Sequence, residues 1–176
     1  MIYKPVPYII GDIVAKVREG YSELGIEPYY EYGTALEVVN TLSLKAESVE
    51  FEDKRYPLIW FLVKDSLKQE VKYNRATPRI AKDLTIIFCT ITSAEYRAAD
   101  RFANTFIPIL RPLYDLFVHY LKLSNEVRSI THFSHNYYEN MFWGRDGLYG
   151  HEGNIFNDRL DAIIVDNLDL HLIEKC

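Results

Sequence analysis

The stretch that decides the fold is Leu84-Thr85-Ile86-Ile87-Phe88-Cys89-Thr90-Ile91-Thr92. It is rich in β-branched residues, which favour the pleated and half-buried environment of a strand. The residues that follow, Thr92-Ser93-Ala94-Glu95, match the capping-box pattern of a helix N-terminus. A strong strand that turns directly into a helix predicts a domain of mixed α and β structure.

Further strands are predicted on both sides of this stretch. The residues from Pro57 to Val63 are apolar at every position, which is typical of a strand buried on both faces. Residues 71–73 are candidates for a partner strand, and residues 127–138 have room for another. Residues 160–173 look like a closing strand or hairpin. The alternation of apolar and polar residues changes phase at Asp166-Asn167, which suggests a bulge or tight turn. The sequence therefore predicts an α+β fold.

Three helical regions are predicted. A helix over residues 9–24 follows from apolar residues at spacings of three and four: Ile10, Ile13, Val14, Val17, Tyr21 and Leu24. A second capping box, from Thr34 to Glu37, predicts a short helix over residues 34–46, although its β-branched residues leave a strand as the alternative. A long helix over residues 93–122 contains Pro108 and Pro112, so a break is expected near residues 107–112.

The second half of that long helix carries one narrow polar stripe, formed by Arg111, Asp115, His119 and Lys122. Apolar and aromatic residues occupy the rest of its circumference, so more than one side of the helix must be covered. The cover is either a sheet together with a second helix, or a neighbouring subunit.

Length and composition restrict the class of protein. A chain of 176 residues is expected to form a single domain over residues 1–176. The net charge of −5 argues against a dedicated nucleic-acid binder, because neutralising phosphates needs a basic face. No apolar stretch reaches the length of a membrane span, and no leader peptide is evident. Cys89 and Cys176 do not predict a disulfide framework, so a reducing cytoplasm is the expected place of synthesis.

Candidates for catalysis are few. Histidines at 132, 135 and 151, together with Asp158, Asp161, Asp166 and Asp169, allow a metal-dependent hydrolase or nuclease as an alternative function. Motifs for a serine nucleophile or a phosphate-binding loop are absent, and Cys89 lies inside a predicted buried strand. The preferred interpretation is therefore a protein without enzymatic activity and without a cofactor.

Tyrosine is the unusual feature of the composition, with 14 residues. Tyrosine combines an apolar ring with a polar hydroxyl and is enriched at protein interfaces. Two uses of these residues are open: contacts with other subunits, and ordinary packing within the chain's own subunit.

Five segments carry a family resemblance: Tyr32 to Leu42, Tyr56-Pro57-Leu58-Ile59-Trp60, Phe106 to Pro112, Phe142-Trp143-Gly144, and Asn154 to Ile163. In their order along the chain they resemble the small neck and tail-completion proteins of tailed bacteriophages, including crAss-like phages. That group contains tail terminators and head–tail joining ring proteins.

The resemblance implies a small, mostly antiparallel sheet flanked by helices, with no active site. It implies a ring of six or twelve copies in the virion neck or tail, assembled in the host cytoplasm. The ring would contact adjoining portal, neck or tail proteins and would let DNA pass without sequence-specific binding. Neither composition nor spacing separates this interpretation from an adaptor that docks a peptide on a strand edge.

Aromatic and arginine side chains dominate interface energies where they become fully desolvated. The residues predicted to contact neighbouring subunits are Tyr29, Tyr30, Tyr32, Tyr137, Tyr138, Trp143 and Arg145.

Overall fold

The computed structural model describes residues 4–22, 25, 27–48, 55–64, 67–71, 79–128, 135–141 and 158–173. Their helices are α1 (Val6–Tyr21), α2 (Ala35–Glu47), α3 (Ala98–Arg101), the π-helix η2 (Phe102–Leu110) and α4 (Arg111–Leu123). Their strands are β1 (Tyr29–Gly33), β2 (Leu58–Leu62), β3 (Lys68–Val71), β4 (Arg79–Ile91), β5 (Asn136–Asn140) and β6 (Leu160–Leu172).

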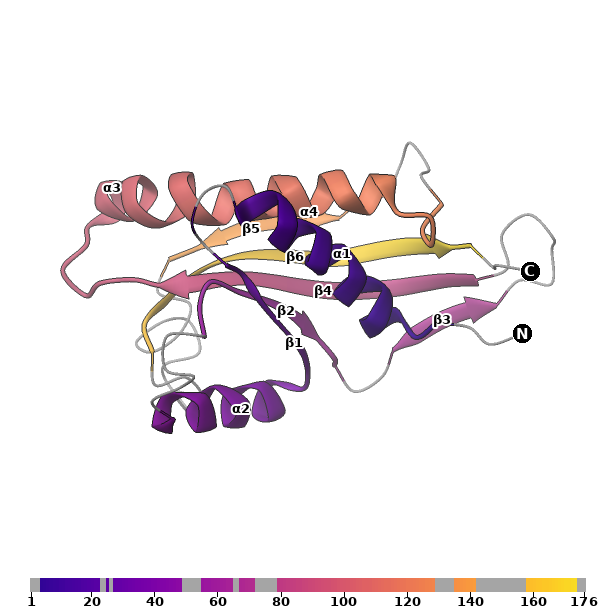
Figure 1. Cartoon of the computed structure of the whole chain (residues 1–176), viewed down its shortest axis with the longest axis horizontal. Coiled ribbons are helices and arrows are strands. Elements are labelled where there is room, and N and C mark those ends of the chain that lie inside the picture. The colour runs from indigo at the N-terminus through magenta and orange to yellow at the C-terminus, as the bar shows by residue number, and fades with distance from the viewer. Residues whose placement is uncertain are drawn as a thin grey trace.

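The strands form one sheet in the order β1-β2-β4-β6-β5, and β3 pairs with the first part of β4. Only β1 and β2 run parallel among the described strands, so the sheet is mostly antiparallel, as predicted. Figure 1 shows α1 and the continuous arm α3–η2–α4 along one face of the sheet, with α2 on the other. The prediction of an α+β fold is confirmed.

The longest pairing joins β4 to β6, from Arg79 opposite Leu172 to Ile91 opposite Leu160. Its register shifts twice, next to Asp83 on one strand and Asn167 on the other, and both residues have positive φ angles of 56° and 53°. The bulge predicted at Asp166-Asn167 is confirmed. Because Asn167 is the extra residue, Val165 and Leu168 both point into the larger core.

Each face of the sheet has its own core. The larger core lies under α1, η2 and α4, and Phe88 packs there against Phe117 with ring centroids 5.4 Å apart. The smaller core lies under α2, where Val38 and Leu42 cover Trp60 and Cys89. From Leu58 to Phe61 every residue of β2 is at most 1% exposed, which confirms a strand buried on both faces.

A buried ion pair fixes the arm to the sheet. Arg101 is 1% exposed and Asp161 of β6 is 0% exposed, and the guanidinium Nη1 lies 2.6 Å from the Asp161 Oδ1. The same guanidinium donates to the Thr92 hydroxyl at 3.0 Å and to the Ser93 carbonyl at 2.9 Å. The Thr105 hydroxyl lies 2.8 Å from the other Asp161 oxygen. These bonds surround a buried charge pair with polar partners, which burial requires.

The helical arm differs from its prediction at two points. It begins at Ala98 instead of residue 93, because Thr92 and Ser93 hold the Arg101 guanidinium and the Asp100 carboxylate accepts from the Arg97 N–H at 3.0 Å. The arm divides into two segments between Leu110 and Arg111, inside the predicted range, but the π-helix η2 passes directly into α4 without a gap in the helix.

A hydrogen bond from α1 supplies a donor that the prolines of the arm cannot provide. In an α-helix the Pro108 carbonyl would accept from residue 112, which is proline and has no N–H. The Tyr21 hydroxyl of α1 takes that place and lies 3.1 Å from the Pro108 carbonyl and 3.0 Å from the Ile109 carbonyl. Burial raises the pKa of Tyr21 to about 12, so this donor keeps its proton. The Tyr21 hydroxyl thereby binds the arm to α1 at the end of η2.

The remaining predictions are confirmed or shifted by a few residues. The first helix covers residues 6–21 instead of 9–24, because Pro7 suits a first helical turn. The helix predicted over residues 34–46 is α2, and its Thr34–Glu37 capping box is formed, so the alternative of a strand is wrong. The partner strand expected at residues 71–73 is β3 at Lys68–Val71, and within residues 127–138 the strand β5 begins only at Asn136.

The cover over α4 is the first of the two options considered. The buried residues Leu113, Phe117 and Leu121 of α4 belong to the larger core, which α1 and the sheet share. The described part of α4 therefore does not need a second subunit to cover its apolar side.

Removing the charge of Asp161 is expected to destabilise the fold strongly. Asp161→Asn leaves the Arg101 guanidinium buried without its counter-charge, which costs about 3–5 kcal/mol. The control is Asp83→Asn, whose partner Lys68 is exposed, and its cost is about 0–1 kcal/mol. Urea unfolding midpoints measure both variants. Equal midpoints for the two variants would contradict the role given to Asp161.

Candidate subunit interface

One candidate surface follows strand β1 at the border of the sheet. Tyr8 of α1 and Tyr32 of β1 are 54% and 47% exposed, with ring centroids 6.1 Å apart. Tyr30 lies behind them, packs against the larger core and donates from its hydroxyl to the Pro7 carbonyl at 2.7 Å. Burial raises the pKa of Tyr30. We call the exposed pair Tyr8 and Tyr32 the β1 border.

Tyr29 and Tyr30, both predicted to contact other subunits, are engaged within their own subunit. Tyr29 packs against the smaller core, and Arg18 and Lys45 approach its ring to 5.8 Å and 5.9 Å. Tyr30 is held by its hydrogen bond to α1. Of the three predicted tyrosines in β1, Tyr32 is the most exposed.

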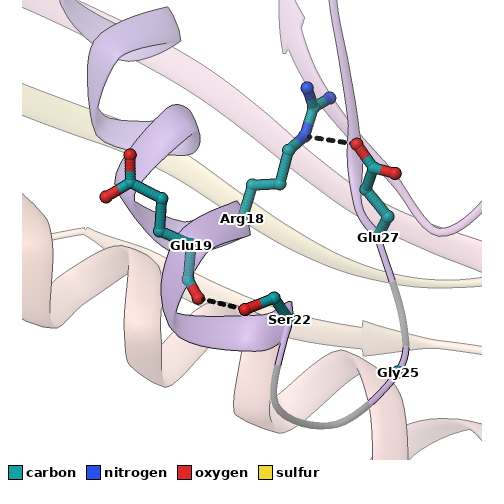
Figure 2. A pocket seen from close by; sticks show the side chains of 5 residues that line it. All are labelled: Arg18, Glu19, Ser22, Gly25 and Glu27. Carbon is teal, nitrogen blue, oxygen red and sulfur yellow. Dashed lines mark hydrogen bonds and ion pairs between the residues drawn. The ribbon is translucent and has the colours of Figure 1, made fainter.

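A surface pocket of about 450 Å³ lies beside the C-terminal end of α1 (Figure 2). Its lining residues are Arg18, Glu19, Ser22, Gly25 and Glu27. The Arg18 Nε donates to the Pro28 carbonyl at 3.0 Å and lies 3.4 Å from the Glu27 carboxylate. These contacts tie the end of α1 to the start of β1, so the charges of Arg18 and Glu27 are already partnered.

The other candidate surface follows strand β5 at the opposite border. Tyr137 and Tyr138 are 38% and 49% exposed and point to opposite faces of the sheet. Tyr137 packs on Tyr114 of α4, with centroids 4.8 Å apart, and donates to the Glu139 carboxylate at 2.7 Å. Arg111 binds the same carboxylate through two bonds, of 2.7 Å and 3.1 Å. We call Tyr137 and Tyr138 the β5 border.

The electrostatics of the β5 border follow from these contacts. Hydrogen bonding by Arg111 lowers the pKa of Glu139, and burial followed by the bond to Glu139 raises the pKa of Tyr137. Glu139 therefore stays ionised and Tyr137 stays protonated near neutral pH.

Arg111 was predicted only as part of a helical polar stripe, and Tyr8 was not singled out at all. The packing of α1 and α4 on the sheet brings Tyr8 next to Tyr32 and Arg111 next to Glu139.

The alternative metal site is not assembled by the described residues. The four aspartates are held by different partners: Asp158 by Arg55 and Tyr56, Asp161 by Arg101, Asp166 by Lys64 and Thr85, and Asp169 by the Asp83 N–H. His135 has a different partner, since its Nε2 lies 2.7 Å from the Tyr114 hydroxyl. Within the described ranges, no group of three His, Cys, Asp or Glu side chains could hold a metal ion.

Several predicted residues lie outside the described residues. They are Trp143 and Arg145 of the predicted interface, and His132 and His151 of the alternative metal site.

No protein-family model, curated protein or solved structure matches this chain. Within the described parts of the chain, none of the helices combines the length and apolar character needed to cross a bilayer.

Acid is expected to weaken the fold through His135. Burial lowers the pKa of His135 below its usual value of about 6.5, so between these two values only the unfolded chain takes up the proton. The free energy of unfolding is therefore complete above about pH 6.5 and falls as the pH drops toward the pKa of the folded state. Urea unfolding midpoints between pH 7.5 and 5 measure the effect. His135→Gln should reduce this dependence, and an unchanged dependence in this variant would contradict the role given to His135.

The Cys89 thiol is expected to stay unreactive in the folded protein. Its side chain is 0% exposed, and burial raises the pKa of the thiol, so almost no thiolate forms at neutral pH. In a Cys176→Ser variant, a thiol reagent should therefore label Cys89 only as fast as the protein unfolds. Rapid labelling without denaturant would contradict the buried position of Cys89 in the smaller core.

Proposed function

We propose that this protein is a structural subunit that assembles with copies of itself into a ring, in the neck of a tailed phage or at the head-proximal end of its tail. The observation that carries the proposal is the pair of exposed tyrosine borders. They lie at opposite ends of one sheet and are built from different residues. The resemblance to neck and tail-completion proteins supplies the location.

Two different borders suit a ring for a geometric reason. A ring of identical subunits needs head-to-tail contacts, in which one surface of each copy meets a different surface of the next. A closed dimer needs only one self-complementary surface. The β1 border and the β5 border differ in their residues and lie on opposite sides of each subunit, as a ring requires.

The exposed tyrosines also suit contacts that form after folding. The aromatic ring of each tyrosine carries apolar surface, and burying it gains about 25 cal/mol for every Å² removed from water. Tyr29 and Tyr30 are used inside the subunit, so Tyr8, Tyr32, Tyr137 and Tyr138 remain for contacts between copies.

In the proposed assembly, six or twelve copies surround a channel for DNA and contact adjoining portal, neck or tail proteins. The net charge of −5 suits a channel wall that lets DNA slide, because a basic wall would bind the phosphates. No cofactor and no catalytic step belong to this function.

Native mass spectrometry across a concentration series tests the proposal. We expect a species of six or twelve copies that carries no metal. Tyr32→Ser combined with Tyr138→Ser should raise the concentration of half-assembly at least about tenfold, which corresponds to a loss of about 1.4 kcal/mol. The control is Ile91→Ser, whose side chain is 50% exposed at the end of the central strand β4, two strands away from β1 and from β5. A metal-bearing monomer that cleaves nucleic acid would favour the hydrolase alternative instead.

A further inference from the structure

We infer that strand β5 of one copy pairs with strand β1 of the next copy, so that one antiparallel sheet continues from subunit to subunit. The inference rests on the proposed self-assembly and identifies the partner of each border as a second copy of this chain. It assigns the contact to main-chain hydrogen bonds, with the tyrosines beside them.

Both strands have an open edge within the described residues. There, β1 pairs only with β2, and β5 pairs only with β6. The Tyr29 N–H donates to the Pro57 carbonyl at 2.8 Å, and the Gly33 carbonyl accepts from the Val63 N–H at 3.0 Å. Because main-chain groups alternate in direction along a strand, Tyr30 and Tyr32 turn their N–H and C=O groups away from β2. The outer edge of β1 therefore offers donors and acceptors to another strand.

Strand direction favours a second copy as that partner. Strand β1 runs parallel to β2, and each of the steps β2–β4, β4–β6 and β6–β5 reverses the direction. Strand β5 therefore runs opposite to β1. A copy added alongside without being turned over brings its β1 antiparallel to the β5 of the first copy, which is the more stable pairing. Both strands have five residues, so their lengths match.

The two edges also lack three of the features with which proteins prevent strand pairing. Edge strands are commonly protected by lysine, proline or a bulge. Here β1 reads YYEYG and β5 reads NYYEN, and the two bulges lie in the central pair of strands instead. The charged residues on these strands are Glu31 and Glu139, which are paired with Lys45 and Arg111 of their own subunit. Their charges therefore do not repel an incoming strand.

Side chains at the proposed joint are compatible on both faces. On the face covered by α1 and α4, Tyr32 of one copy would lie near Tyr137 of the next, and aromatic cross-strand pairs stabilise sheets. On the face covered by α2, Tyr138 would approach the Glu31–Lys45 pair. The tyrosines of both borders thus become buried in the same contact.

Mixing two variants tests the pairing. Tyr32→Lys blocks the edge of β1 and Tyr138→Lys blocks the edge of β5, and both replaced side chains are about half exposed, so each variant should fold. Neither variant alone should form rings. Their mixture should form a dimer with one copy of each, because only one intact β5 can meet one intact β1.

Four outcomes separate the inference from the proposed function. Heterodimers in the mixture, with no larger species, support the pairing of β5 with β1. Rings of wild-type size from either variant would overturn the pairing and leave the ring proposal standing. Homodimers of one variant alone would indicate pairing of equal edges and overturn the inference. A wild-type protein that stays monomeric at every concentration would overturn both proposals.

Hydrogen exchange gives a second measurement that needs no variant. On assembly, the amides of Tyr30 and Tyr32 should exchange at least about tenfold more slowly, since they gain partners across the joint. The amide of Glu31 should change less, because it already faces β2. Equal slowing of Glu31 and Tyr32, or no slowing at all, would overturn main-chain pairing.

Discussion

The ion pair between Arg101 and Asp161 is the contact on which the rest of the structure depends. It binds the start of the helical arm to strand β6, and the same guanidinium holds the connection that leaves β4. A buried pair of this kind stabilises little by itself but penalises every arrangement that separates its charges. The arm is therefore held in one position along the sheet, and Arg111 and Tyr114 are placed above β5, where they bind Glu139 and Tyr137.

The main features of the fold were predictable because their signals are local. Runs of apolar and β-branched residues mark β2 and β4, the capping box marks α2, and a slip of alternation marks the bulge at Asn167. The short edge strands were not recognised as such. Their residues, YYEYG and NYYEN, become strands only through neighbours distant in the sequence. The start of the arm was missed because Arg101 competes for the residues of the predicted cap.

The sequence predicts tyrosine as the residue type of the candidate subunit interface, but it identifies only some of the individual tyrosines. Tyrosine excess pointed to an interface, yet Tyr30 is held by the Pro7 carbonyl and Tyr29 by two cations. The sequence also suggested an acidic cluster near the end of the chain. The fold instead gives each aspartate a separate partner, and Asp158 finds Arg55 across 103 positions of the chain. Spacing along a sequence contains no information about such distant partners.

The pairing of β4 with β6 has a consequence for the order of events during synthesis. Strand β6 is the last of the described strands to leave the ribosome, yet it lies between β4 and β5 in the sheet. Until it emerges, β5 has no strand to lie against, and a nascent chain has at most one of its two borders. In the proposed ring, a chain that still lacks β6 would therefore be unable to link two neighbours.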